Sequence, residues 1–165
     1  MPYSSTAFKE EVKAHLLEHI PGMARVLDVG PGAGTYGEML NSKRIIDAVE
    51  IFEPYIDMFN LRDKYTKVFN GNILSFDLSP YDYVILGDVL EHIPKYEAIN
   101  LIKRIDDEGI HCLVAVPYLY EQGEYMNNIH ETHHQPDLTH EIFLQRYPSM
   151  KLLFKDEGYG YYTNY

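Results

Sequence analysis

The sequence has little cysteine, little positive charge and no long hydrophobic run. Its one cysteine, Cys112, cannot form a disulfide within the chain, and its place in the apolar run IHCLVAV favours a small buried side chain over a nucleophile. Only 14 lysines and arginines stand against 25 acidic residues, and the net charge of -11 argues against a nucleic acid as partner. No apolar run approaches the roughly 18 to 20 residues that span a bilayer, so no membrane association is expected.

The length and the first residues set the expected organisation. A chain of 165 residues suits a single domain, residues 1–165, and no internal repeat or low-complexity linker divides it. The start MPYSSTAFKEEVK lacks the basic-then-apolar layout of a signal peptide. We therefore expect a cytoplasmic protein.

Strand-like and helix-like segments alternate along the chain. The pattern predicts helices at residues 6–20 (the N-terminal segment 1–20), 54–64, 94–105 and 138–146, and another from the glycine turn to about residue 41. It predicts strands at 25–29, 44–50, 67–70, 81–87, 111–116, 151–157 and 159–165. This order predicts an α/β fold, a Rossmann-like, doubly wound and mostly parallel seven-stranded sheet. The last two strands flank Gly158, and so short a connection allows only an antiparallel C-terminal hairpin.

The stretch VLDVGPGAGTYGEML places Gly30, Gly32 and Gly34 in a turn between a strand and a helix. Such a turn brings bare backbone and a helix N-terminus up to a ligand. Glu50 ends the next strand, where a carboxylate can accept both hydroxyls of a ribose. Asp28, at the end of a buried strand, needs a partner, which a cationic ligand would supply. Together these residues indicate an adenosine-like ligand.

Over nearly its whole length the chain resembles the class I S-adenosylmethionine-dependent methyltransferases. The acidic residue and alternating glycines of that family's first motif match DVGPGAG, and the acidic end of its second strand matches Glu50 in DAVEIFEPY. Asn72 in NGNIL matches a polar position that commonly faces the adenine. The family's D-x-x-E-H pattern matches Asp88, Glu91 and His92. Sheets of this family also commonly end in an antiparallel hairpin, as the last two predicted strands of this chain would form.

The resemblance implies S-adenosyl-L-methionine as the cofactor and in-line transfer of its methyl group. The implied cofactor-binding residues are Asp28, Gly30, Gly32, Gly34, Glu50, Asn72 and Asp88. Glu50 would hold the ribose, and Asp28 would organise the turn or receive the ligand's ammonium group through water. Tyr36 or another aromatic residue would lie near the sulfonium by cation-π attraction.

A histidine-rich insertion, residues 117–136, follows the fifth predicted strand, at an edge where α/β proteins bind ligands. Three interpretations stay open: a general base, a metal site, or a polar lid with solvated histidines. The candidate catalytic residues are His133, His130, Glu131 and His92. The run matches no tight zinc spacing and contains no H-E-x-x-H, so the metal site is the least favoured of the three and we name no metal ligand.

The insertion also resembles a subset of small bacterial and phage-type methyltransferases that are tied to sugar or surface-polymer modification. This resemblance implies a small-molecule or sugar-like acceptor, methylated at oxygen or nitrogen. Two alternatives share the glycine turn: an NAD-dependent oxidoreductase and a non-catalytic cofactor-binding module. The acidic residue before Gly30, the DVLEH segment and the terminal hairpin argue against the oxidoreductase.

Overall fold

The computed structural model describes residues 7–165, which form two compact units divided between Ile85 and Leu86. The strands follow the order β3-β2-β1-β4-β5-β7-β6 in one seven-stranded sheet. The α/β class, the seven strands and the antiparallel C-terminal hairpin expected from the sequence are confirmed. The expectation of a single domain stays a prediction.

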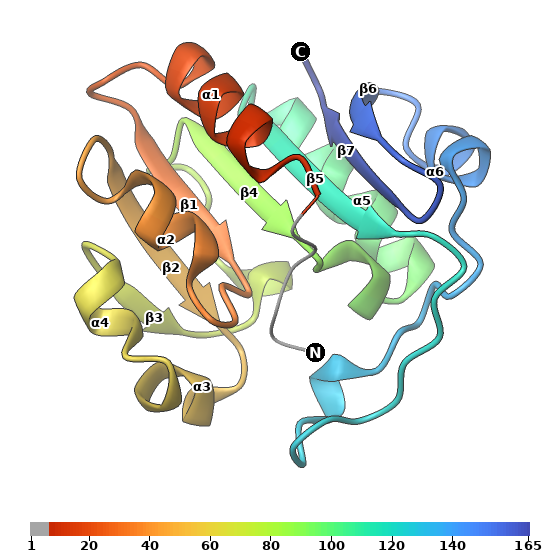
Figure 1. Cartoon of the computed structure of the whole chain (residues 1–165), viewed down its shortest axis with the longest axis horizontal. Helices are drawn as coiled ribbons and strands as arrows, with labels where there is room; N and C mark the ends of the chain where they lie inside the picture. Colours follow the sequence, from red (N-terminus) through yellow and green to blue (C-terminus); the bar gives the residue numbers. More distant parts are fainter. Residues whose placement is uncertain (1–6) are drawn as a thin grey trace. The chain divides into compact units, whose positions relative to one another are not determined.

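The first unit alternates helices with parallel strands (Figure 1). In chain order its elements are α1 (Lys9–His19), β1 (Arg25–Val29), α2 (Thr35–Leu40), β2 (Ile45–Glu50), α3 (Glu53–Met58), α4 (Leu61–Lys64), β3 (Val68–Asn70) and the 3-10 turn η1 (Ile73–Ser75). β2 lies between β1 and β3, with Asp28 opposite Ala48 and Glu50 opposite Asn70. Because these strands run parallel, their carboxyl ends bring Asp28 and Glu50 to one edge of the sheet.

The N-terminal helix predicted at residues 6–20 is α1, although residue 6 lies outside the described residues. Val12 and Leu16 of its expected apolar stripe are buried. Arg44 closes the helix, since its guanidinium donates to the carbonyls of Leu17 and Ile20 at 2.7 and 2.9 Å. The last carbonyls of a helix have no partner within it, so this side chain fixes the C-terminal end of α1.

The prediction of a single helix at residues 54–64 is wrong, because α3 and α4 are separate helices. Asn60 lies between the two helices and has a left-handed backbone with a φ of 50°. Asparagine tolerates this conformation better than most residues. The break lets α4 carry Lys64 to the glycine turn. Its ammonium donates to the carbonyl of Ala33 at 2.7 Å and pairs with Glu38 at 2.7 Å.

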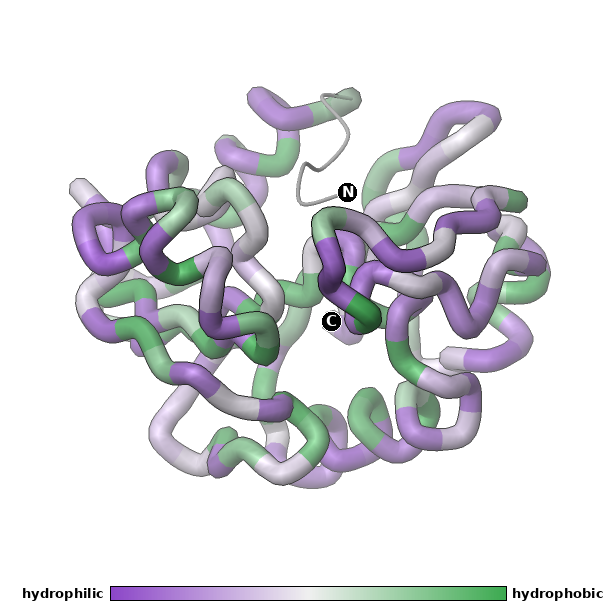
Figure 2. Tube along the Cα trace, turned by 90° about the horizontal axis from the view of Figure 1, so that it is seen from below, coloured by the Kyte–Doolittle hydropathy of each residue, from purple (hydrophilic) through white to green (hydrophobic). Residues whose placement is uncertain are grey.

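The second unit follows β4 (Tyr83–Gly87), the strand in which the division falls. Its elements are the 3-10 turn η2 (Leu90–His92), α5 (Lys95–Asp107), β5 (His111–Pro117), the 3-10 turn η3 (Ile129–Glu131), α6 (His140–Arg146), β6 (Lys151–Lys155) and β7 (Tyr159–Thr163). β7 pairs antiparallel with both β5 and β6. α5 buries Ala98, Leu101, Ile102 and Ile105, an amphipathic spacing. Hydrophobic and hydrophilic residues alternate at short intervals along the described part of the trace (Figure 2).

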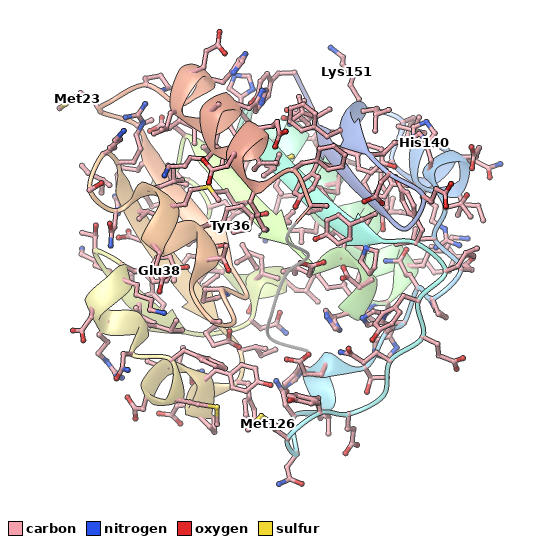
Figure 3. All side chains as sticks on the ribbon, in the orientation of Figure 1. Met23, Tyr36, Glu38, Met126, His140 and Lys151 are labelled. Atoms are coloured by element: carbon pink, nitrogen blue, oxygen red, sulfur yellow. The ribbon has the colours of Figure 1, made fainter. Side chains whose placement is uncertain are left out.

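The predicted insertion forms most of the long connection between β5 and α6. It carries η3, and Met126, which is half exposed, lies at the tip of this loop (Figure 3). α6 begins at Thr139, whose hydroxyl accepts a hydrogen bond from the backbone N–H of Ile142 at 3.2 Å. Among residues 7–165 no helix has the length and apolar character needed to cross a membrane.

Candidate functional site

The glycine turn of the first unit has the backbone that the sequence indicated. Gly30, Gly32 and Gly34 have φ of 57°, 50° and 83°, in the left-handed region that glycine adopts without strain. A Cβ at Gly34 would also lie 2.6 Å from Cδ of Lys64. Gly37 has another role, since a Cβ there would lie 2.5 Å from the ring of Tyr65. Three glycines therefore shape the turn, and the fourth allows a helix to pack against an aromatic ring.

Asp28 is buried and has a partner from the chain itself. The hydroxyl of Tyr65 donates to its carboxylate at 2.6 Å and accepts from the backbone N–H of Gly37 at 3.1 Å. Burial raises the pKa of Asp28 to about 7, against the lowering effects of the Tyr65 hydrogen bond and the Lys9 charge. The resemblance implied that Asp28 either organises the turn or receives the ligand's ammonium group through water. The hydrogen bonds through Tyr65 support the first of these roles.

Tyr36 is a buried residue of α2, the helix on which Figure 3 also labels Glu38. The ammonium of Lys9 lies 4.8 Å from the centroid of the Tyr36 ring. A cation-π contact is therefore present, but its cation belongs to α1. The suggested contact between Tyr36 and a sulfonium stays a prediction, and Lys9 already uses this ring.

Glu50 and Asn72 lie after neighbouring strands of the first unit. Glu50 is 3% exposed, and one of its carboxylate oxygens accepts the backbone N–H of Phe52 at 2.8 Å. The Asn72 side chain is exposed, and its oxygen caps η1 by accepting the N–H of Leu74 at 2.9 Å. The carboxylate of Glu50 is thus held at the strand end, as a ribose contact requires. The side-chain oxygen of Asn72 is already engaged in capping η1.

Asp88 belongs to the second unit and directly follows β4. Its φ of 59° is left-handed, and its backbone N–H donates to the carbonyl of Ala115 at 2.9 Å. The hydroxyl of Tyr159 on β7 donates to its carboxylate at 2.5 Å. A strained backbone that is tied to two strands holds this carboxylate in one orientation.

Within the described residues of the second unit, Glu91, His92 and His133 form a cluster of three side chains of the types that bind metal ions. One nitrogen of each imidazole and one carboxylate oxygen lie within 4.8 Å of one another. The two rings meet edge to face, with centroids 4.6 Å apart. We call these three residues the Glu91 cluster.

Backbone hydrogen bonds join the two segments that supply the Glu91 cluster. The N–H groups of His134 and Gln135 both donate to the carbonyl of Glu91, at 2.7 and 3.1 Å. The side-chain amide of Gln135 donates to the carbonyls of Leu90 and Ile93, at 2.7 and 3.0 Å. The insertion is therefore fastened to η2 at the point where His133 meets His92.

Protonation of the Glu91 cluster follows from its burial. Burial and the neighbouring His133 lower the pKa of His92 to about 4, and burial also lowers the pKa of His133. Burial and the charge of Asp88 raise the pKa of Glu91 well above its usual range. Both imidazoles are thus neutral at pH 7, with lone pairs that can accept a proton or bind a cation.

The other two candidate catalytic residues lie outside this cluster. His130 is exposed, and its backbone N–H donates to the side chain of Asn128 at 3.0 Å. Glu131 is 7% exposed and accepts the amide of Gln122 both at its carbonyl, 2.8 Å, and at its carboxylate, 3.1 Å. Of the four predicted catalytic residues, the structure brings together His92 and His133.

Glu91 is the residue that the sequence interpretation passed over. It was visible as the glutamate of the D-x-x-E-H match, but it was not chosen as a site residue. It is 1% exposed, and one carboxylate oxygen, Oε2, has no hydrogen-bond partner within residues 7–165. A buried carboxylate oxygen without a hydrogen-bond partner needs an explanation, which makes Glu91 a candidate site residue. Burial cannot be read from the sequence, so the motif alone did not point to Glu91.

Comparisons with known proteins identify the family. Residues 5–161 match the family model described as a methyltransferase domain. The chain belongs to the methyltransferases. That match covers almost the whole sequence and confirms the methyltransferase family that the resemblance named, and solved structures of S-adenosylmethionine-dependent enzymes share the fold. No curated protein matches the sequence.

Solved structures share the fold of this methyltransferase at low sequence identity. The magnesium protoporphyrin IX methyltransferase of Synechocystis PCC 6803, with bound SAH, has a TM-score of 0.63 and 13% identity over 94% of this chain and 81% of that one. A SAM-dependent methyltransferase of Archaeoglobus fulgidus has a TM-score of 0.63 and 21% identity over 89% and 72%. A TehB-like SAM-dependent methyltransferase of Corynebacterium glutamicum gives 0.60 and 14% over 92% and 85%.

Proposed function

We propose that the protein transfers the methyl group of S-adenosylmethionine to a hydroxyl oxygen of a small, sugar-like molecule. The observation that supports the donor assignment is the glycine turn, where Gly30, Gly32 and Gly34 are left-handed beside the buried carboxylate of Glu50. Bare backbone can approach the methionine portion, and the carboxylate can accept the ribose hydroxyls.

The Glu91 cluster of the second unit supplies the candidate base for the acceptor. In the proposed reaction the acceptor oxygen forms a bond to the methyl carbon, the bond between that carbon and sulfur breaks, and S-adenosylhomocysteine leaves as a neutral thioether. The hydroxyl must also lose its proton, and a base whose pKa lies near the working pH promotes this step. His133 is half-buried and neutral at pH 7, so it is the preferred base, whereas a pKa of about 4 makes His92 a weak base.

Nitrogen acceptors form the second candidate class carried over from the sequence. An amine that reaches the enzyme unprotonated needs no base before attack, so the buried histidines favour oxygen. A small-molecule partner and a cytoplasmic location stay predictions from the sequence, and the acidic balance of the whole chain supports an acceptor that is not a nucleic acid.

The proposal is tested by following S-adenosylhomocysteine formation with a panel of sugars, polyols and amines. We expect turnover with hydroxyl acceptors, and His133→Ala should lower kcat by about a hundredfold or more with unchanged affinity for S-adenosylhomocysteine. His134→Ala is the matched control, since His134 is the exposed neighbour. Turnover with amines alone, or full turnover in His133→Ala, would remove the oxygen assignment.

A further inference from the structure

We propose that Glu91, His92 and His133 bind a divalent transition-metal cation such as Zn²⁺. The three side chains offer two imidazole nitrogens and one carboxylate oxygen within 4.8 Å of one another. Two imidazoles with one carboxylate form a donor set that suits zinc and its neighbours among the divalent metals, while magnesium and calcium prefer oxygen ligands throughout.

The hydrogen bonds of the two histidines prepare them as ligands. Nδ1 of His133 lies 2.8 Å from the carbonyl of Tyr120, and Nδ1 of His92 lies 3.4 Å from the carbonyl of Thr132. A carbonyl oxygen can only accept a hydrogen bond, so these contacts assign the hydrogen to Nδ1 of each ring and leave the lone pair on Nε2. Metal-binding histidines usually donate their second nitrogen to a carbonyl or carboxylate in this way, which fixes the tautomer and the ring orientation.

Glu91 supplies the observation that is independent of spacing. Its side chain is 1% exposed, and Oε2 is a buried oxygen without a hydrogen-bond donor in the described chain from Ala7 to Tyr165. A buried carboxylate is costly unless a hydrogen bond, an opposite charge or a metal compensates it. A cation shared with the two imidazoles provides that compensation.

The scaffold brings the ligands close without any metal, and the remaining movement is small. Ligands at about 2.1 Å from a tetrahedral cation lie about 3.4 Å apart, so a pair at 4.8 Å closes by about 1.4 Å on binding. His133 is half-buried and comes from the insertion, whose backbone is fixed to Glu91 through His134 and Gln135. A modest rotation of the His133 side chain therefore completes the set.

A role for the cation in catalysis rests on the function proposed above. Three protein ligands leave coordination positions for a water molecule or for an oxygen of the acceptor, as in catalytic zinc sites with two histidines and a glutamate. A hydroxyl bound to a divalent cation loses its proton at a lower pH. The cluster would then promote deprotonation through the metal, with the histidine lone pairs engaged as ligands.

The binding test uses the full chain after treatment with a chelator, titrated with Zn²⁺ in a calorimeter and with Co²⁺ in an absorption spectrometer. We expect one ion per chain and visible Co²⁺ bands of a low-symmetry site. Glu91→Gln, which preserves the shape of the side chain, and His133→Ala should each weaken binding by about tenfold or more. Far-ultraviolet circular dichroism and thermal unfolding in chelator show that both variants are folded.

Two control variants separate this site from adventitious binding. His134→Ala changes an exposed neighbour, and His15→Gln changes the stacked pair of His15 and His19 on α1, whose ring centroids lie 4.1 Å apart. Neither should alter the stoichiometry or the affinity. No binding in the unmodified chain, or binding lost in a control but kept in Glu91→Gln and His133→Ala, overturns the proposal.

The same protein samples are titrated with S-adenosylhomocysteine, because the two proposals can fail separately. Binding of the nucleoside without binding of Zn²⁺ overturns the metal site and leaves the methyltransferase assignment standing. Binding of Zn²⁺ without the nucleoside supports the metal site and removes the catalytic role that rests on the proposed function.

Discussion

The buried pair of Asp28 and Tyr65 makes the stability of the protein depend on pH. The folded state holds the pKa of Asp28 at about 7, mainly through burial, whereas an exposed aspartate in the unfolded chain titrates near about 3.9. Between these values the folded state keeps a proton that the unfolded state has released. This residue therefore lowers the free energy of unfolding as the pH rises from about 4 to about 7, and it has no further effect outside that window.

Asp28→Asn should remove this pH dependence. We expect the free energy of unfolding of the variant, minus that of the unmodified protein, to rise from pH 4 to pH 7 by up to about 1.4 kcal/mol per pH unit and then to level off. Urea denaturation at four pH values measures the difference. A difference for Asp28→Asn that does not change with pH would show that burial does not raise the pKa of Asp28 in the folded protein.

At the level of elements, the turn between β1 and α2 depends on a backbone that only glycine adopts freely. Gly34→Ala would impose a left-handed φ of 83° on alanine and place its Cβ 2.6 Å from Cδ of Lys64. We expect a loss of about 1 to 3 kcal/mol in the free energy of unfolding, measured by urea denaturation, together with weaker binding of S-adenosylhomocysteine.

Gly22→Ala is the matched control for that substitution. Gly22 has no positive φ, and a Cβ there meets no atom within 4 Å. Its stability should equal that of the unmodified protein. Equal stability of Gly34→Ala and Gly22→Ala would mean that the turn relaxes around a side chain, and that its conformation is not set by glycine.

The elements were predictable from the sequence where local pattern decides them. The apolar runs of β1, β4 and β5 are buried, and the short link at Gly158 gave the hairpin. The division of residues 54–64 into two helices was not predictable, because it depends on one left-handed residue, Asn60, in an otherwise helical pattern. The 3-10 turns at η1, η2 and η3 are too short to leave a periodicity.

The site was predictable in part, and the missing part depends on burial and tertiary contact. The glycine turn, Asp28 and Glu50 follow from motif spacing, and the structure places each at a strand end. The partner of Asp28 is Tyr65, which lies 37 residues away and belongs to no motif. The meeting of Glu91 with His133 likewise depends on hydrogen bonds between segments about 40 residues apart.

For the whole molecule, the fold, the family match and the glycine turn point to one methyl donor. The family match covers residues 5–161, so the assignment does not depend on one motif. The NAD-dependent alternative shared only the glycine turn and the ribose carboxylate with this class. Whether the chain binds S-adenosylhomocysteine or NAD therefore distinguishes the two enzyme classes directly.

The first measurement is calorimetric titration of the purified full chain with S-adenosylhomocysteine and, separately, with NAD. We expect S-adenosylhomocysteine to bind one-to-one at micromolar concentration, and NAD not to bind. Glu50→Gln should weaken S-adenosylhomocysteine by about tenfold or more through lost ribose hydrogen bonds, while Glu53→Gln, an exposed neighbour, should bind normally. Absence of S-adenosylhomocysteine binding, or equal affinity in Glu50→Gln, would contradict the assignment of the glycine turn and Glu50 to the methyl donor.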